Sequence, residues 1–452
     1  MTLFRLSPEL SRHESDQPSA TPAEAVPPMA GSLDTEVRVH GSSVSLSEAF
    51  LDTSSFDRIR ASLPEQHRTH LDELRQGILA FCKEFGIPVE TLRSKEAFGV
   101  ELTSKRIPPE RMAHAVSLFA RLEYLVTNRE PLKIEFEALK EVEPLYHLTE
   151  QYNTQIALLE RVGILKDGAI TGIDGNKYHI PTLEQIAARL YERKEELSTK
   201  RDQGFTKLLL VPFGMSLDIL RETLKQFLLT YQQTHPAFDL DTNEPLWTWE
   251  KGYNGADTGN PPKIVYNPKS FDGNHQGLTK LQILEEQKTL NQVQGDKGCA
   301  GWRIHLLQPQ DSSDSTSKGF AFIPRQGQGK TQGKETPRRD LEAGKFPNDY
   351  LSILQEVQDD PASPYYNESG LTPEDWILAF MTHLTETGEP LDDFESSKES
   401  ITYLTGAFFP SIDGSALVPY ASWRRVFRQA CLGVSVPRSR FGYIGVRSAV
   451  VI

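Results

Sequence analysis

The last stretch of the chain, from Gly414 to Ile452, contains no Asp, Glu or Lys but carries six arginines. Asp and Glu account for 62 of the 452 residues, so an acid-free run of this length arises by chance well under about 1% of the time. The same stretch is rich in Val, Ile, Tyr and Phe and is strand-like. It predicts a β-structured end of the chain with a basic surface, and a core strand pair that happens to lack acids is the alternative.

The length of 452 residues predicts two or three domains, each able to bury its own core. A net charge of −13 argues against a general nucleic-acid binder. No apolar run is long enough to span a bilayer, and the start lacks the pattern of a secretory signal. Three cysteines that lie far apart favour a reducing cytoplasm, with export by an unconventional route left open.

Composition and periodicity divide the chain into three parts. Residues 1–55, rich in Ser, Pro, Glu and Ala, are expected to form a disordered arm. Residues 56–203 read as a helical domain, and a boundary is placed near Gly204 after a charge-dense helix. Residues 204–452 read as an α+β domain with loop insertions at about 250–300 and 311–340, where Gly, Asn, Pro, Ser and Gln are frequent.

Local signals place several elements. Asp174-Gly175 predicts the turn of a short hairpin, and Ser216 predicts the N-cap of a helix. Two capping boxes are expected, one at Thr182 with Gln185 and one at Thr372 with Asp375, the second followed by Pro373 in the first helical position.

No motif for catalysis, phosphate binding or metal binding is complete in this sequence. The segment GQGKT (327–331) has Pro324 where a phosphate-binding loop needs its first Gly, and Pro offers no N–H. His67 and His70 share a helix face without a third ligand, and no G-x-S-x-G pattern occurs. We therefore predict no catalytic residue, no metal and no cofactor.

The Arg-rich segment 424–443 is the predicted working surface. Arg beside Phe and Tyr can bind by ion pairing, bidentate hydrogen bonding and stacking, and Tyr, Ser and Gly adapt to varied contacts. The expected ligand is a protein or another macromolecule. The predicted ligand-binding residues are Arg424, Arg425, Arg428, Gln429, Cys431, Gly433, Ser435, Arg438, Ser439, Arg440, Phe441 and Tyr443.

This tail resembles the variable region of proteins diversified by retroelements. In that family a C-type lectin-like domain ends with a Trp-Arg-like stretch, a variable segment and a final G-[FV]-R strand. Here these elements are Trp423, the segment 424–443 and Gly445-Val446-Arg447. Template adenines are randomised in the family, so Asn codons yield fifteen residue types. Of positions 424–443, only Gln429 falls outside that set.

The resemblance implies that the helical N-terminal domain, which periodicity predicts, is followed by a C-type lectin-like domain that binds without chemistry. Contact positions would alternate with a buried frame along the strands. The frame expected is Trp423, Phe427, Ala430, Leu432, Pro437, Ile444, Val446 and Arg447.

Two rival functions stay open at this point. The same domain occurs in formylglycine-generating oxidases and sulfatase-modifying factors. Those enzymes need paired cysteines, whereas Cys431 stands alone here, so an oxidase or its inactive relative is the alternative. An Arg-mediated nucleic-acid binder is the third hypothesis, and it would show steep salt dependence.

Overall fold

The computed structural model divides the chain into two compact units, Met1–Leu132 and Lys133–Ile452. In the second unit it describes residues 134–294, 299–311, 314, 316–327, 339–356, 360, 363–394 and 400–452. In the first it describes residues 36–39, 42–45, 53–93 and some residues between 98 and 126. Within the described residues, no helix has the length and apolar character needed to cross a membrane.

The first unit is mainly helical in its described part. A two-stranded antiparallel hairpin, β1 (Glu36–Val39) with β2 (Ser42–Ser45), precedes α2 (Thr53–Ser62), α3 (Glu65–Glu84) and the 3-10 helix η1 (Val89–Arg93). Leu71, Leu74 and Ile78 of α3 form one apolar stripe in the core of this unit. The hairpin and the start of α2 fall within the predicted arm, so its expected disorder is wrong there. Residues 1–35 lie outside the described residues.

The predicted boundary at Gly204 is wrong, because the helices before it belong to the second unit. Leu158, Leu190 and Leu197 lie in the same core as the strand that follows Gly204. Gln151 and Gln155 also donate to and accept from the backbone of that strand, at 2.8–3.1 Å. Apolar packing and side-chain hydrogen bonds therefore both join these helices to the second unit.

The second unit begins with helices and small hairpin strands and ends with strands. Its helices are α6 (Ile134–Tyr146), α7 (Leu148–Arg161), α8 (Leu183–Glu192), α9 (Lys194–Asp202), α10 (Leu217–Thr234), α11 (Glu250–Tyr253), α12 (Lys280–Gln294), η2 (Arg339–Leu341), α13 (Pro347–Glu356) and α14 (Pro373–Thr387). Its strands are β3 (Ala169–Thr171), β4 (Lys177–His179), β5 (Lys207–Val211), β6 (Leu246–Thr248), β7 (Val265–Tyr266), β8 (Arg303–Leu307), β9 (Glu368–Gly370), β10 (Ile401–Tyr403), β11 (Ala407–Ile412), β12 (Ser415–Arg424), β13 (Gln429–Ser435), β14 (Ile444–Val446) and β15 (Ser448–Val451). The α+β class expected from the sequence is confirmed.

Most of the local signals are confirmed. Strands β3 and β4 pair antiparallel around the turn at Asp174-Gly175, where Gly175 has a φ of 77°. The hydroxyl of Ser216 accepts from the N–H of Asp218 at the start of α10. Both capping boxes form, at α8 and at α14.

Two predictions about the extents of helices are wrong. The segment 280–294, assigned to a loop, forms helix α12, which has only a narrow apolar stripe at Ile283 and Leu284. The charge-dense helix expected after Thr182 breaks at Arg193 into α8 and α9.

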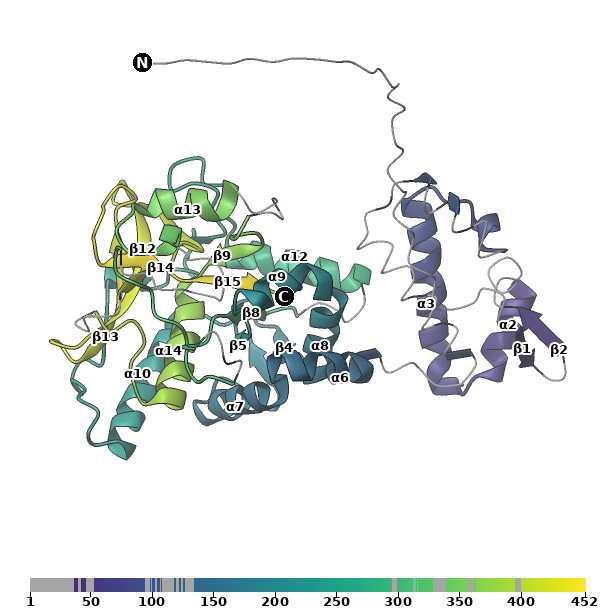
Figure 1. Ribbon diagram of the computed structural model, residues 1–452, viewed down its shortest axis with the longest axis horizontal. Helices are drawn as coiled ribbons and strands as arrows, with labels where there is room; N and C mark the ends of the chain where they lie inside the picture. The colour runs from purple at the N-terminus through teal and green to yellow at the C-terminus, as the bar shows by residue number, and fades with distance from the viewer. Residues whose placement is uncertain are drawn as a thin grey trace, which may run out of the picture. The chain divides into compact units, whose positions relative to one another are not determined.

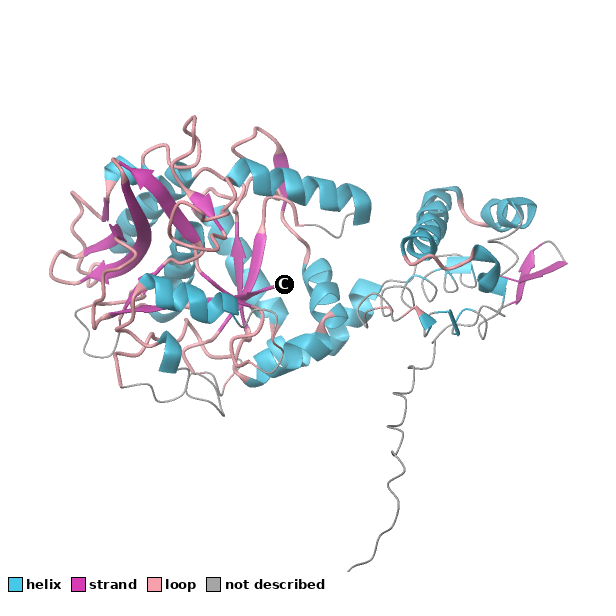
Figure 2. Ribbon diagram, turned by 90° about the horizontal axis from the view of Figure 1, so that it is seen from above, coloured by secondary structure: helices cyan, strands magenta, loops and turns pink. Residues whose placement is uncertain are grey.

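Apart from the β3–β4 hairpin, the strands of the second unit form two sheets. The first has the order β5-β8-β15-β9 and is antiparallel throughout. The second follows the path β14-β10-β12-β11-β7, and β13 pairs with both β12 and β6. Its pairs are antiparallel except β10 with β14 and β13 with β6. Figure 2 shows these strands flanked by helices.

Helix α14 packs against strand β5 of the first sheet, strand β12 of the second and helix α10. Figure 1 shows α10 and α14 side by side, and α14 contacts strand β12. Residues 373–384 of α14 are all buried, including several polar ones. The buried Glu374 pairs with Lys280 at 2.8 Å, and Asp375 pairs with His305 at 3.0 Å. The helix is therefore the centre of the unit.

His383 of α14 provides a test of this burial. Its Nδ1 accepts a hydrogen bond from the backbone N–H of Phe320 at 2.9 Å. Burial, with the charges of Arg447 and Lys207, lowers the pKa of His383 from 6.5 to about 3. The unfolded chain therefore binds a proton that the native chain does not, so stability falls as pH drops from 6.5 toward 3, by up to about 1.4 kcal/mol per pH unit.

We expect His383→Asn to remove this part of the acid sensitivity, because the amide oxygen can accept the same bond without titrating. The measurement is urea unfolding at several pH values, followed by tryptophan fluorescence. All five tryptophans lie in the second unit, so the signal reports that unit. A variant with the wild-type pH slope would contradict the buried, neutral His383.

Candidate ligand-binding surface

The predicted surface is built on the hairpin of β12 and β13. The two strands pair from Val418 with Ser435 to Arg424 with Gln429. Residues 425–428 make the tip, and Arg428 closes it in the left-handed conformation, with a φ of 53°. The segment then leaves β13, forms the loop 436–443 and enters β14 beside β10. Two separate loops, the tip and 436–443, thus carry most of the predicted residues.

One face of the hairpin is fixed to the main core. Trp423, 3% exposed, lies with Ala430 and Leu432 in the core that contains α14 and α10. The indole ring lies 5.2 Å from Phe238 and 6.1 Å from Phe380, measured between ring centroids. The backbone of Trp423 also bonds to Asp392 and Phe394 on the strand-like segment beside it. The expected burial of Trp423, Ala430 and Leu432 is confirmed.

A second core covers the other face of the sheet. Ile444 and Val446 of β14 lie in it together with Tyr403 and with residues of α13. Tyr443 and Tyr420 are packed against its edge. The burial expected for Ile444 and Val446 is confirmed.

The loop 436–443 returns over this same face. The backbone carbonyl of Ser439 accepts from the hydroxyl of Tyr403 at 3.2 Å. Burial raises the pKa of Tyr420 to about 12, with nearby Cys431, Arg424 and Tyr443 also acting on it. Phe394 provides a direct link between the two parts of the segment: its N–H donates to the carbonyl of Trp423 at 3.1 Å, and its ring lies 4.7 Å from that of Tyr443. The tip end of the hairpin and the end of the loop therefore both lie beside Phe394.

The exposed part of the segment mixes arginine with apolar side chains. Arg425, Val426, Phe427 and Arg428 are exposed at the tip. Val436, Arg438, Arg440 and Phe441 are exposed on the loop. Arg424, Ser435, Ser439 and Tyr443 are partly exposed. Phe427, Phe441 and Phe346 are the three exposed phenylalanines of the described residues, and Phe346 lies two residues from Gly344, whose carbonyl accepts from Arg440.

Acids from elsewhere in the chain contact two of the arginines. The guanidinium of Arg425 pairs with the buried carboxylate of Asp393, and its Nε lies 2.9 Å from that carboxylate. Arg428 pairs more loosely with the exposed Asp239, at 3.4 Å. Within the described part of the chain, Arg424, Arg438 and Arg440 form no ion pair. Arg440 donates instead to the carbonyl of Gly344, and Arg424 lies over the ring of Phe427.

Three predicted ligand-binding residues are buried, so the simple alternation expected for β13 is wrong. Gln429, Cys431 and Gly433 are covered, and the amide of Gln429 donates to the carbonyl of Glu244 at 2.9 Å. Strand β13 is flanked on both edges, by β12 and β6, and a Cβ on Gly433 would lie 2.2 Å from the ring of Tyr420. Residues 429–433 therefore belong to the frame.

Phe427 behaves in the opposite way. It was assigned to the buried frame, but it is 49% exposed at the tip. The guanidinium of Arg424 lies 4.3 Å from the centre of its ring, an arrangement that stabilises both side chains at an exposed site only weakly. A tip residue cannot reach either core, so Phe427 joins the exposed set.

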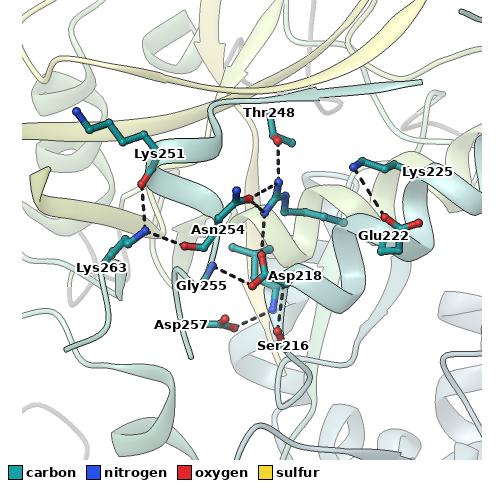
Figure 3. A network of polar contacts seen from close by, with 12 residues as sticks. Ser216, Asp218, Glu222, Lys225, Thr248, Lys251, Asn254, Gly255, Asp257 and Lys263 are labelled. Atoms are coloured by element: carbon teal, nitrogen blue, oxygen red, sulfur yellow. Dashed lines mark hydrogen bonds and ion pairs between the residues drawn. The ribbon is translucent and has the colours of Figure 1, made fainter. Parts of the chain in front are cut away.

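A polar network around Arg221 of α10 stabilises the buried frame of the hairpin at its β6 edge. The guanidinium donates to Asp218 at 2.8 Å, to Thr248 at 2.7 Å and to Asn254 at 3.2 Å. Asp218, Thr248 and Asn254 can be followed in Figure 3. Because Thr248 ends β6, which pairs with β13, the network ties helix α10 to the edge of the hairpin.

Arg447, the arginine of the G-x-R strand, is a frame residue as expected. It is buried and donates to Asp392 at 2.6 Å and to the carbonyl of Ala321. The second oxygen of Asp392 accepts from the indole of Trp376 at 2.9 Å. Arg447 thereby joins the end of the chain to helix α14.

Sequence reasoning missed several neighbours of the surface. Phe394 lies 4.7 Å from Tyr443 between ring centroids, and the guanidinium of Arg325 lies 5.6 Å from Phe394. Asp393 and Asp239 supply the carboxylates for the tip. These residues come from segments far from the tail, and no pattern in the sequence links them to it.

Comparisons with family models, with curated proteins and with solved structures found no match for this chain. Among the described residues, no group of three or more His, Cys, Asp or Glu side chains is placed to hold a metal ion. The site is therefore interpreted from its own geometry.

The contrast between frame and tip gives a prediction on stability. Trp423→Ala should cost roughly 3–5 kcal/mol, because it removes a buried aromatic side chain from a packed core. Phe427→Ala, four residues away, should stay within about 0.5 kcal/mol, because that ring is exposed at the tip. Urea unfolding of both full-length variants, followed by the four tryptophans they share, measures the difference. Equal losses would show that Phe427 is structural.

Proposed function

We propose that this chain is a non-enzymatic binding protein that recognises a macromolecular ligand through the tip 425–428 and the loop 436–443. The observation that carries the proposal is the juxtaposition of exposed Arg, Phe and Val side chains with a buried frame in one short segment. Arginine and aromatic residues supply most of the binding energy at many protein interfaces. Three arginines without ion pairs among the described residues favour a protein ligand that presents carboxylates beside an apolar patch.

We further propose that the second unit is a C-type lectin-like scaffold whose exposed tail positions are diversified by a retroelement. The exposed residues Val426, Phe427, Arg428, Val436, Arg438, Arg440 and Phe441 all belong to the set that a randomised Asn codon can encode. The buried Gln429 falls outside that set and holds a frame contact to Glu244. A surface whose exposed residues are diversified while its buried frame residues stay constant requires this separation between variable and fixed positions.

The oxidase alternative is less well supported by the geometry. All three cysteines are free, and Cys431 is buried within β13. Burial raises the pKa of its thiol to about 11, with Arg424 and Ser422 opposing the shift. A protonated, covered thiol is a weak nucleophile and a poor redox centre.

The neighbouring genome tests the diversification. We expect a near-repeat of the coding sequence for residues 420–452 close to a reverse-transcriptase gene, with the two copies differing at adenines of the repeat. A genome that lacks such a repeat would leave the binding proposal standing and remove the retroelement from it.

A library tests the binding surface itself. Randomising the exposed positions Val426, Phe427, Arg428, Val436, Arg438, Arg440 and Phe441 together should leave most members folded, because exposed substitutions usually change stability within about 0.5 kcal/mol each. Selection of the displayed library against one acidic protein of known structure should yield binders that weaken as salt is added.

A matched library at the buried positions 429–432 of the same hairpin is the control, and most of its members should be unfolded. If the exposed library folds as poorly as the control, or if no member binds above the parent chain, the segment is not an adaptable recognition surface. Arg425 is left unchanged in both libraries, because its removal would leave the buried Asp393 without this ion pair.

A further inference from the structure

A cavity of about 300 Å³ lies in the second unit, and none of its lining residues belongs to the tail surface, which is the tip 425–428 with the loop 436–443. Strands β8, β9 and β15 contribute Arg303, His305, Ser369 and Val451 to its wall, and helix α12 contributes Ile283, Gln287 and Leu290. Leu290 and Val451 are exposed, at 54% and 44%, so the cavity opens to solvent beside them. Its size falls at the lower end of the range for small-molecule sites.

A cation in this wall lacks a carboxylate partner. The guanidinium of Arg303 forms no ion pair with the described residues, and the only hydrogen bond it donates to them is a long one to Asn267, at 3.4 Å. The ring of Phe213 covers one flank, with its centroid 3.7 Å from Cζ. Stacking holds the planar group in place and leaves its N–H edge for a ligand, a geometry suited to a carboxylate.

A second polar group of the wall is also unsatisfied. His305 is buried, and its Nε2 lies 3.0 Å from a carboxylate oxygen of Asp375. The carboxylate of Asp375 also accepts from the N–H of Thr372, so it can only accept from the imidazole. Nε2 then carries the hydrogen of this contact, which leaves Nδ1 as the other polar atom of the ring. That Nδ1 has no hydrogen-bond partner in the described structure, although it is buried.

We propose that this cavity binds a small hydroxycarboxylic acid. The carboxylate of the ligand pairs with Arg303, and its hydroxyl forms a hydrogen bond with Nδ1 of His305. The apolar body of the ligand packs against Ile283, Leu290 and Val451 at the mouth. This arrangement supplies the two polar groups of the wall with the partners they lack, and leaving a buried polar atom without a partner is unfavourable.

Binding to the full-length chain tests the proposal, with mandelate and 2-hydroxyisocaproate as probes. Each combines a carboxylate, a neighbouring hydroxyl and an apolar body of suitable size. Phenylacetate and isocaproate lack the hydroxyl, and mandelamide lacks the charge. Ligand-observed NMR should show saturable binding of at least one hydroxy acid, with affinity reduced about tenfold or more for the matching control compound, because either change leaves a buried group unpaired.

Variants distinguish the site from adventitious binding. Arg303→Gln should weaken binding about tenfold to a hundredfold, because it removes a charge-assisted pair. Arg161→Gln, which changes an exposed arginine of α7, should have no effect. Val451→Trp places a bulky ring at the mouth and keeps both Arg303 and His305, so it should abolish binding even if Arg303→Gln proves poorly folded.

Three results would overturn the proposal. They are absence of saturable binding of both hydroxy acids up to about 10 mM, equal affinity for compounds without the hydroxyl or the charge, and binding that survives Val451→Trp. The tail surface is not involved in any of these measurements, so their outcome is independent of the library experiment.

Discussion

The burial of helix α14 is the constraint on which the rest of the second unit depends. The helix is covered by both sheets and by α10, so its polar side chains cannot reach bulk water. Each polar group must therefore find a partner inside the unit. Glu374 binds Lys280 of α12, and Asp375 binds His305 of β8 while also closing the capping box with Thr372. These contacts fix α12 and the first sheet relative to one helix, which apolar packing alone would do with less directional control.

Contacts with helix α14 hold the frame of the tail surface in place. Trp423 packs on Phe380 of α14, and Arg447 and Trp376 share the two oxygens of Asp392. On the opposite edge, Arg221 holds β6 against β13. The exposed residues thus stand on loops whose ends are fixed on both sides. A recognition surface that is ordered before binding loses less conformational entropy when the ligand arrives.

Local signals in the sequence were sufficient for the caps of α8, α10 and α14, for the hairpin of β3 and β4, and for the Trp423 and Val446 frame, because each depends on residues close in the chain. Long-range contacts were not predictable in this way. Strand β6 pairs with residues 430–432 of β13 from far upstream, and Cys431 and Gly433, which a pattern of period two assigns to the outside, are both buried. The boundary at Gly204 failed for the same reason: the helices before it pack on strands formed by residues after it.

The acid-free composition of the tail has a direct physical consequence for recognition. An arginine there cannot be neutralised by a neighbour in sequence, so any carboxylate must come from a distant segment or from a ligand. The protein supplies such partners to Arg425 and Arg428 at the tip, through Asp393 and Asp239, whereas Arg438 on the loop has no ion pair in the described structure. Apart from the pair of Arg425 with the buried Asp393, the ion pairs that support the fold, such as Arg447 with Asp392, lie outside residues 424–443. The charges of the loop can therefore change without disturbing them, which is the property that a replaceable binding surface requires.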